Sequence, residues 1–461
     1  MPLELVPIAS LKLNRETLRS FVHKRGAAFL EGWSEDAPWK IVLPWPEEVL
    51  ELAWSRTAHW LQTLASLSSS TLSSSTNDCG SISGSPFRSG WVGFVSYELG
   101  AELEDARPRE CDPIEPPFFF ARHERAILVD PRGRHFLCVS SELLEESLRE
   151  LAAMAAEAER RAIETATTPV SARHTIRTSL DATDYESRVS EIRESIANGD
   201  VYQVNLTRSF TIDAALDPFH LYFALTGATT GALTGAMPPR CSALIHGGDW
   251  TVASASPEVF LTYDALNGRA SSRPIKGTIE RTGDDAGDRA RLLTSAKDAA
   301  EHLMIVDLVR NDFGKIAPAG NVSVPLFREV LELERLLHLE STVEVSGISE
   351  VPFEKLFSAL FPAGSITGAP KRAAVRQIRE LEPAPRGIYS GTIGFFDRGG
   401  VSQWSVAIRT AVVSARETRY HAGGGIVWES VPSLEENESR AKAAQFLSYA
   451  AGDSPDRDGT K

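Results

Sequence analysis

The chain has 461 residues, of which 42% are hydrophobic and 24% charged, and its formal net charge is -14. This length and apolar fraction are sufficient for a large buried core in one to three domains. The acidic balance argues against binding to nucleic acid or to anionic membranes. We find no signal peptide and no stretch of about 18 apolar residues, so we expect a cytoplasmic protein without a membrane span.

The N-terminal part of the chain, residues 1–170, mixes several kinds of pattern. A serine-dominated segment at residues 64–84 contains few apolar side chains, which predicts a flexible surface loop. Strands are expected at 91–97 and 126–129, and a helix at 141–165. A polar segment at 167–178 is typical of a linker and predicts a boundary near residue 175.

The second part, residues 175–450, alternates helical and strand patterns and is expected to form one catalytic domain. Helices are predicted at residues 185–197, 295–309 and 370–381. Strands are predicted at residues 243–246, 251–255, 343–345 and 391–396. Residues 453–461 are expected to be a disordered tail.

The four cysteines do not form a recognisable framework. None of them belongs to a C-x-x-C pair or to a His/Cys cluster, so disulfide and zinc interpretations are weak. They are Cys79, Cys111, Cys138 and Cys241.

A lysine between an apolar residue and a glycine is the first candidate for chemistry. Lys276 lies in PIKGT, residues 274–278, where Gly277 permits close approach of another part of the backbone. Burial lowers the pKa of such a lysine, so that its amine can act as a nucleophile. An ordinary exposed turn lysine is the alternative.

Two pairs of carboxylates recur at helical spacing. Asp298 and Glu301 are three residues apart on one predicted helix, and Glu435 and Glu438 repeat this spacing near the C-terminus. Carboxylates on one face repel unless a cation lies between them, and hard oxygen ligands suit Mg²⁺. The two pairs therefore indicate one shared metal, with two solvated helix faces as the alternative.

Two glycine-rich segments can present backbone N–H groups to an anion. The first is FPAGSITGAPK at residues 361–371, just before a predicted helix, and the second is GGGIV at residues 423–427. Neither matches a phosphate-binding loop or a dinucleotide fingerprint.

Taken together, these segments resemble the chorismate-utilising enzymes, which include anthranilate synthase component I, aminodeoxychorismate synthase component I, isochorismate synthase and salicylate synthase. GWVGFVSYELG (90–100) is similar to the N-terminal region of the amidotransferase-linked members. The other matching blocks follow one order: GDVYQVNL (199–206), ASPEVFL (255–261), PIKGT, AEHLMIVDLVRND (300–312), FPAGSITGAPK, IYSGTIGFF (388–396), VAIRTAVV (406–413), GGGIV and ENESRAK (436–442). The resemblance implies an α/β (α+β) fold with two large, facing, antiparallel-rich sheets, helices outside and the site between the sheets.

The resemblance assigns the carboxylates to a metal. Glu301 and Glu438 match Mg²⁺ ligands, and Asp298 and Glu435 match residues in the outer shell of the metal. The Mg²⁺ would hold the ring carboxylate of chorismate and help the C4 hydroxyl to leave.

The resemblance also assigns the catalytic and substrate-binding groups. Glu258 matches the general acid that protonates the departing hydroxyl, and His338 matches a histidine near the ring carboxylate. Tyr389 and Arg409 match residues that hold the enolpyruvyl carboxylate, with Arg409 forming a bidentate pair. The anion site is completed by Thr367, Gly423, Gly424, Gly425 and Lys442.

Two positions distinguish the activities within the family. Isochorismate and salicylate synthases carry a lysine base where this chain has Gln203, so activation of water at C2 is disfavoured. Anthranilate synthases resemble PIAGT, whereas Lys276 is the signature of aminodeoxychorismate synthases. The expected reaction is amination of chorismate at C4 to 4-amino-4-deoxychorismate, for 4-aminobenzoate and folate biosynthesis.

The expected partner is a separate glutamine amidotransferase, because no cysteine lies in a glutaminase motif such as G-x-C-x-G. The alternative activity is that of anthranilate synthase component I, which makes anthranilate and pyruvate. A non-catalytic homologue that binds chorismate or an aromatic amino acid is a third possibility. The presence of Glu258, Glu301, Glu438 and Arg409 argues against it.

Overall fold

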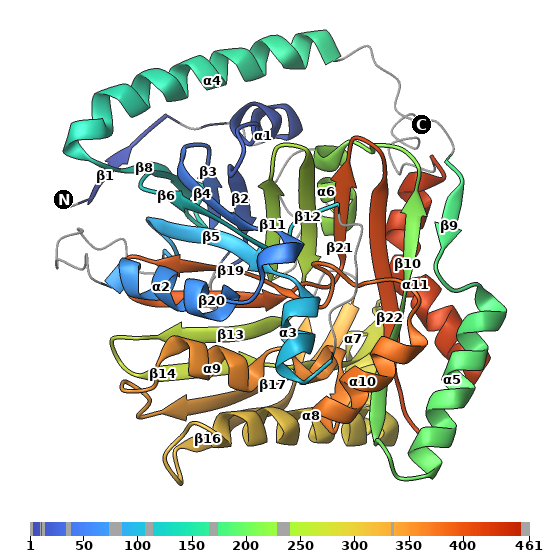
Figure 1. The fold of residues 1–461 in the computed structure, drawn as a ribbon. Coiled ribbons are helices and arrows are strands. Elements are labelled where there is room, and N and C mark those ends of the chain that lie inside the picture. The colour runs from blue at the N-terminus through green and yellow to red at the C-terminus, as the bar shows by residue number, and fades with distance from the viewer. Residues whose placement is uncertain are drawn as a thin grey trace.

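The computed structural model describes residues 3–9, 11, 14–33, 38–72, 85–106, 114–165, 174–227, 240–332 and 336–452. These residues form two large sheets with helices on their outer faces (Figure 1). The strand pairs within the described residues are antiparallel. The expected α/β architecture of two facing antiparallel sheets is therefore confirmed.

The first sheet has 12 strands. Across the sheet they are β1 (Leu3–Pro7), β8 (His135–Ser140), β7 (Ala126–Val129), β3 (Lys40–Leu43), β2 (Ala28–Glu31), β11 (Cys241–His246), β12 (Trp250–Ser256), β21 (Thr410–Ser414), β22 (Thr418–Ile426), β10 (Gln203–Ile212) and β18 (Gly368–Ala369), with β9 (Ile176–Thr178) also on β10.

The second sheet has 10 strands. Across the sheet they are β15 (Ile275–Glu280), β17 (Leu336–Ser346), β14 (Arg269–Arg273), β13 (Val259–Asp264), β20 (Val401–Val406), β19 (Thr392–Asp397), β5 (Gly90–Val95), β6 (Phe118–His123) and β4 (Pro46–Leu52), with β16 (Val322–Glu332) also on β17.

The helices lie outside the sheets. They are α1 (Arg15–Phe21), α2 (Trp60–Leu72), α3 (Tyr97–Leu103), α4 (Leu144–Thr165), α5 (Ala182–Ala197), α6 (Pro218–Thr226), α7 (Asp285–Thr294), α8 (Ala296–Gly314), α9 (Phe353–Leu360), α10 (Lys371–Leu381) and α11 (Pro432–Ala450). Among the described residues, no helix is both long and apolar enough to cross a membrane.

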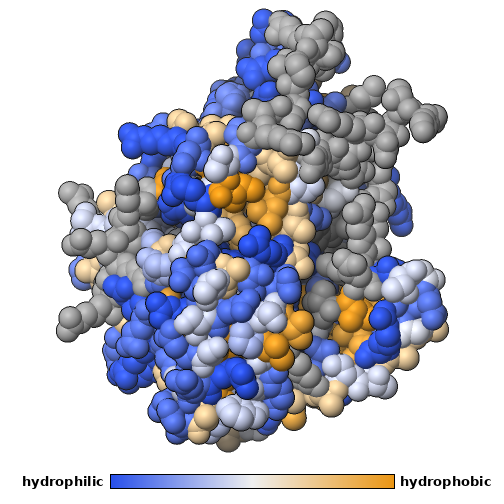
Figure 2. Space-filling view, turned by 90° about the vertical axis from the view of Figure 1, so that its right-hand side faces the viewer, coloured by the Kyte–Doolittle hydropathy of each residue, from blue (hydrophilic) through white to orange (hydrophobic). Residues whose placement is uncertain are grey.

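The alternation of side chains along each strand builds two apolar layers. In β5, Val92 and Phe94 belong to the core between the sheets, whereas Trp91 and Val95 belong to the core beneath α2 and α9. Both faces of the strand are therefore buried, as its continuous apolar sequence requires. Figure 2 shows that the outer surface on the α5 side is mostly hydrophilic, with separate hydrophobic areas.

The segments before and after residue 175 share both sheets. β2 pairs with β11 in the first sheet, and β5 pairs with β19 in the second. The expected linker at 167–178 is wrong for its last part, because residues 176–178 form β9 and pair with β10. Residues 166–173 and the expected tail at 453–461 lie outside the described residues.

The prediction of a loop at residues 64–84 is wrong for residues 64–72, which belong to α2. Leu64 and Leu67 are buried at helical spacing, and the Ser66 and Ser69 hydroxyls donate to carbonyls three and four residues earlier. These bonds satisfy the serines within the helix. Residues 73–84 lie outside the described residues.

Most other expected elements are confirmed with small shifts at their ends. The strand expected at 91–97 ends at Val95, and Tyr97 starts α3. Cys138 and Cys241 are buried free thiols. Cys79 and Cys111 lie outside the described residues.

Candidate active site

A cavity of about 440 Å³ lies where strands of both sheets meet α8 and α11. It is the place that the family resemblance implies for the site. The cavity is lined by Asn205, Pro257, Glu258, Ile275, Lys276, Gly277, Asp298, Glu301, His338, Ser365, Ile366, Tyr389, Ile408, Arg409, Tyr420, His421, Ala422, Gly423, Gly425, Glu438, Ala441 and Lys442.

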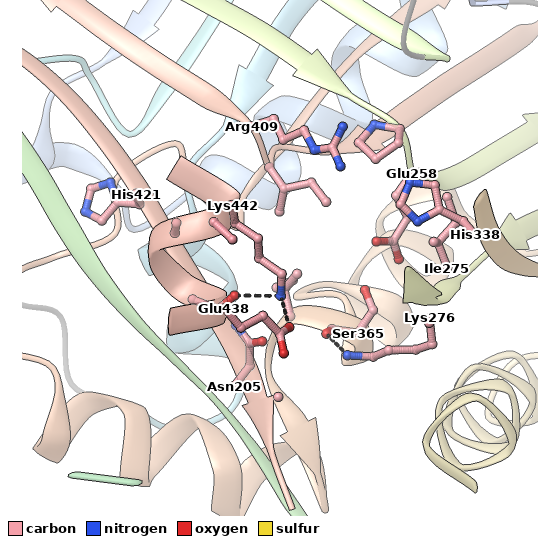
Figure 3. Close-up of a pocket in the computed structure, with 18 of the residues that line it drawn as sticks. Asn205, Glu258, Ile275, Lys276, His338, Ser365, Arg409, His421, Glu438 and Lys442 are labelled. Atoms are coloured by element: carbon pink, nitrogen blue, oxygen red, sulfur yellow. Dashed lines mark hydrogen bonds and ion pairs between the residues drawn. The ribbon is translucent and has the colours of Figure 1, made fainter. Parts of the chain in front are cut away.

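Two short connections carry the chain between the sheets beside this cavity. Residues 257–258 join β12 to β13, and residues 407–409 join β20 to β21. The N–H of Ala255 in β12 donates to the carbonyl of Arg409 at 3.0 Å, and the N–H of Val406 in β20 donates to the carbonyl of Glu258 at 3.0 Å. Each connection is therefore bonded to the strand that leads into the other. Figure 3 shows Glu258 and Arg409 on the same side of the cavity as a result.

Arg409 has an unusual backbone conformation. Its φ of +50° lies in the left-handed region, which non-glycine residues rarely adopt. Strain of this kind persists where the surroundings hold it, and it concentrates at functional sites. Burial lowers the pKa of Arg409, with the Tyr420 phenol acting in the opposite direction. An arginine still keeps its charge at neutral pH, so Arg409 is a fixed cation in the wall.

Lys276 projects into the cavity from an irregular point in β15. The register of β15 on β17 shifts between Lys276 and Thr278, and the intervening Gly277 has a φ of +72°. A bulge with glycine in this conformation redirects the neighbouring side chain. The Lys276 ammonium donates to the carbonyl of Ser365 at 3.3 Å (Figure 3). Lys276 is therefore not an ordinary exposed turn lysine.

Burial shifts the pKa values of Lys276 and of two other groups that line the cavity. It lowers the pKa of Lys276, with Glu301 as the largest opposing influence. It raises the pKa of Glu258 to about 7, against the Ser365 hydroxyl and Lys276. It lowers the pKa of His338 to about 3, an effect that Arg409 strengthens. The site thus combines a carboxyl group that titrates near neutrality with a neutral imidazole.

The four carboxylates come from α8 and α11. Asp298 and Glu301 line the cavity from α8. Ser295 is the N-cap of this helix, and its hydroxyl oxygen accepts a hydrogen bond from the N–H of Asp298. Glu438 lines it from α11, whereas Glu435 lies behind the wall and accepts a 2.6 Å hydrogen bond from the Ser430 hydroxyl. The structure therefore brings three of the four predicted metal residues into the cavity.

Gly424 allows two of these carboxylates to approach the backbone of β22. A Cβ atom at Gly424 would lie 3.3 Å from Oε2 of Glu435 and 3.6 Å from Oε1 of Glu438. Lys442 forms a 2.7 Å ion pair with Glu438 and donates to the Gly423 carbonyl at 2.9 Å (Figure 3).

The donor set fits a hard divalent cation. Among the residues that the structure describes, no three His, Cys, Asp or Glu side chains are gathered closely enough to form a ready metal site. Glu301 and Glu438 nevertheless line the same cavity, from α8 and from α11. Carboxylate oxygens from two helices are the ligands that Mg²⁺ prefers.

Some expected anion-binding residues line the cavity and others lie behind it. Gly423, Gly425 and Tyr389 line it, but Gly424 does not, because alternate residues of β22 face alternate directions. Thr367 is also behind the wall, where its hydroxyl donates to the Ala363 carbonyl at 2.9 Å.

Several lining residues were not singled out from the sequence, although Asn205 and Ser365 lie within matching blocks. The His421 ring stacks on the Tyr389 ring at 5.2 Å and 18° between planes. The position of His421, two residues before the three glycines, was the only feature of the sequence that pointed to it. The ring contact joins neighbouring walls and cannot be read from a single segment.

The fold and the cavity define an α/β protein of two facing sheets with an internal cavity lined by charged side chains of both signs. The family model described as "chorismate binding enzyme" matches residues 36–448. The chain therefore belongs to the family of chorismate binding enzymes.

Similar proteins within the family carry two different names. The chain is 36% identical over 372 residues to the aminodeoxychorismate synthase of Streptomyces griseus, a match that covers 78% of this chain and 50% of that protein. It is 34% identical to aminodeoxychorismate synthase component 1 of Klebsiella aerogenes, covering 78% and 77%. It is 32% identical to anthranilate synthase component 1 of Lactococcus lactis, covering 78% and 79%.

Solved structures agree on the fold. The crystal structure of anthranilate synthase component I from Streptococcus pneumoniae superposes with a TM-score of 0.68 at 23% identity, covering 97% of this chain and 92% of that one. The isochorismate synthase MenF from Escherichia coli superposes with a TM-score of 0.66 at 17% identity, covering 97% and 94%.

Proposed function

We propose that this chain aminates chorismate at C4, in the presence of Mg²⁺, and produces 4-amino-4-deoxychorismate for 4-aminobenzoate and folate biosynthesis. The observation that carries this proposal is the position of Lys276. A partly buried amine with a lowered pKa faces the cavity from a glycine bulge, beside the acid Glu258. An alanine at this position, as in anthranilate synthases, has no nucleophile to offer.

The reaction proceeds by two displacements. The Lys276 amine adds to C2 of chorismate, both ring double bonds shift toward C4, and the C4 hydroxyl leaves as water with the proton of Glu258. Ammonia then adds at C4, both double bonds return, and Lys276 is expelled from C2 as the neutral amine. The proton lost by the new C4 ammonium group restores Glu258 to its acid form. The enolpyruvyl group is retained.

The other residues hold the substrate. Arg409 and Tyr389 bind the enolpyruvyl carboxylate, and the amides of Gly423 and Gly425 extend the anion site. The neutral His338 lies beside Glu258 (Figure 3). In the proposed complex it would face the ring carboxylate and the leaving group.

Glu301 and Glu438 would hold the Mg²⁺, with Asp298 and Glu435 behind them. When bound, the ion supplies positive charge that neutralises the ring carboxylate and helps the hydroxyl to leave. Lys442 forms an ion pair with Glu438 at the edge of this donor set.

The ammonia comes from a separate glutamine amidotransferase. Relatives named component 1 support this partner, because that name implies a second component in those proteins. The second candidate function is that of anthranilate synthase component I, favoured by relatives with that name at 32% and 35% identity.

Product analysis tests the proposal. The chain is incubated with chorismate, Mg²⁺ and ammonium at alkaline pH, beside Lys276→Ala and Lys276→Arg. A 4-amino product that retains the enolpyruvyl group, formed by neither variant, supports the lysine mechanism, since arginine keeps the charge without the nucleophile. Anthranilate and pyruvate from the unmodified chain would instead establish the second candidate.

A further inference from the structure

Strand β10 has a gap in its hydrogen bonding beside the cavity. Its outer edge pairs with β18 at Gln203 and Val204, and with β9 only from Phe210 onward. Between these partners, the Asn205 carbonyl and the Thr207 N–H are left without a neighbouring strand. Buried backbone groups of this kind require other partners.

A buried ion pair fills the gap. Arg386 donates through Nη2 to the Asn205 carbonyl at 2.7 Å, and Oε1 of Glu382 accepts from the Thr207 N–H at 2.9 Å. Arg386 and Glu382 are themselves joined by two bonds of 2.6 and 2.9 Å. The two side chains thus occupy the place of a strand at this edge.

The same guanidinium holds two further segments of the wall. Arg386 donates through Nη1 to the Ile366 carbonyl at 2.8 Å and to the Ser390 hydroxyl at 3.2 Å. With these contacts all five of its N–H donors are used. Asn205 and Ile366 line the cavity, and Ser390 directly follows the lining residue Tyr389.

The backbone that carries Arg386 is anchored from the N-terminal part of the chain. Oε1 of Glu98 accepts from the Arg386 N–H at 2.7 Å, and Oε1 of Glu115 accepts from the Ile388 N–H at 2.9 Å. The ring of Tyr97 lies 4.6 Å from the guanidinium carbon. The segment leading to Tyr389 is therefore fixed at its side chain and its backbone.

We propose that Arg386 is a positioning residue for the reaction in this cavity. It replaces the missing neighbour of β10 and fixes three separated segments, at Asn205, Ile366 and Tyr389, in one arrangement around the substrate. It does not line the cavity itself. Its effect on turnover rests on the proposed function, whereas its effect on the order of the wall does not.

The test compares Arg386→Lys with a matched control, Arg125→Lys. Lysine keeps the charge but cannot reach all the acceptors of a planar fork. Arg125 is also a buried arginine with an ion pair to Glu150 and an aromatic contact with Trp45, but it does not line the cavity. The thermal midpoints of both variants are measured to identify any general loss of stability.

Two readouts are measured on the full chain. Amide hydrogen exchange without substrate should show protection lost at residues 205–207 and 388–390 in Arg386→Lys only. With chorismate, Mg²⁺ and ammonium, kcat/KM of Arg386→Lys should fall on the order of 10- to 100-fold, as expected for a displaced wall, and that of Arg125→Lys should stay unchanged.

Unchanged exchange and unchanged kcat/KM in Arg386→Lys would overturn the proposal. So would an equal loss of kcat/KM in Arg125→Lys, because the loss would then follow stability alone. If the unmodified chain does not consume chorismate, the proposed function fails, and the exchange measurement by itself decides the positioning role.

Discussion

The ammonium group of Lys276 lies close to the backbone of Gly425 in β22, because a Cβ atom at Gly425 would lie only 3.3 Å from the Nζ atom of Lys276. The same Cβ would lie 2.6 Å from Nε2 of Gln203. A side chain at position 425 would therefore collide with Gln203 and crowd Lys276 unless these two side chains moved.

Gly425→Ala should consequently displace Lys276 and Gln203. We expect kcat/KM for chorismate to fall about 10-fold or more, equivalent to roughly 1.4 kcal/mol, with little change in the thermal midpoint, because the clashing atoms are ends of flexible side chains. Gly314→Ala is the control, since nothing lies within 4 Å of the new atom. Wild-type kinetics in Gly425→Ala would show that this close approach is not needed.

Glu258→Gln should change stability in a pH-dependent way. Burial in the folded state raises the pKa of Glu258 from 4.5 to about 7. The protonated carboxyl group therefore stabilises the folded state at low pH, and this contribution to stability is lost as the pH rises through 7. Above pH 7 the variant should be more stable than the unmodified chain, by up to about 3 kcal/mol. The difference should vanish below pH 4.5.

Denaturant unfolding at several pH values measures this difference. Other buried acids, such as Glu98, titrate in both proteins and cancel in the comparison. A variant that is equally stable at pH 5 and pH 8, relative to the unmodified chain, would contradict the raised pKa. Loss of turnover in the same variant would support the acid role of Glu258.

The metal carboxylates should differ in importance. Glu438→Gln replaces a carboxylate that faces the cavity by a neutral amide, and we expect Mg²⁺ binding to be lost. Glu435→Gln changes a residue held by Ser430 behind the wall, so affinity should fall only about 10- to 100-fold, as for an outer partner. Calorimetric titration with Mg²⁺ measures both, and equal losses would contradict this ordering.

The buried ion pair between α8 and α10 should carry stability. Lys371 and Asp312 form a 2.7 Å pair with both side chains about 5% exposed or less. Lys371→Met removes the buried partner of Asp312 and leaves the half-exposed Lys315 beside it, which should cost about 3–5 kcal/mol of unfolding free energy. Lys315→Met removes a half-exposed partner and should cost less than about 1 kcal/mol. Denaturant unfolding compares the two, and equal costs would contradict the argument.

The sequence predicted helices and strands correctly where the residues of a single segment contain the periodicity and the end signals of that element. The helix expected at 185–197 forms α5, with a cap at Asp181 and an end at Asn198, because both ends have local side-chain or turn chemistry. The strand at 126–129 matches β7. The pattern failed at 64–72, where buried leucines and internal serine bonds outweigh the low apolar content.

The candidate site shows the same division. Motif matching identified Lys276, Glu258, Glu301 and Glu438, and these residues do line one cavity. It did not identify Arg386, because two of the groups that Arg386 joins are the backbone carbonyls of Ile366 and Asn205, which lie 20 and 181 residues away along the chain. Backbone acceptors leave no trace in the sequence.

The sequence by itself determined the family, through motif blocks that match in one order, and the resemblance in turn implied the two-sheet fold and the chemical groups offered to the substrate. Only the tertiary structure decided which groups face the cavity. In the structure, Glu435 and Thr367 lie behind the cavity wall, and Lys276 lies beside a bulge in β15. At one edge of β10, the ion pair of Arg386 and Glu382 takes the place of a neighbouring strand. The physical reason is that direction and burial depend on strand register and on contacts between distant segments.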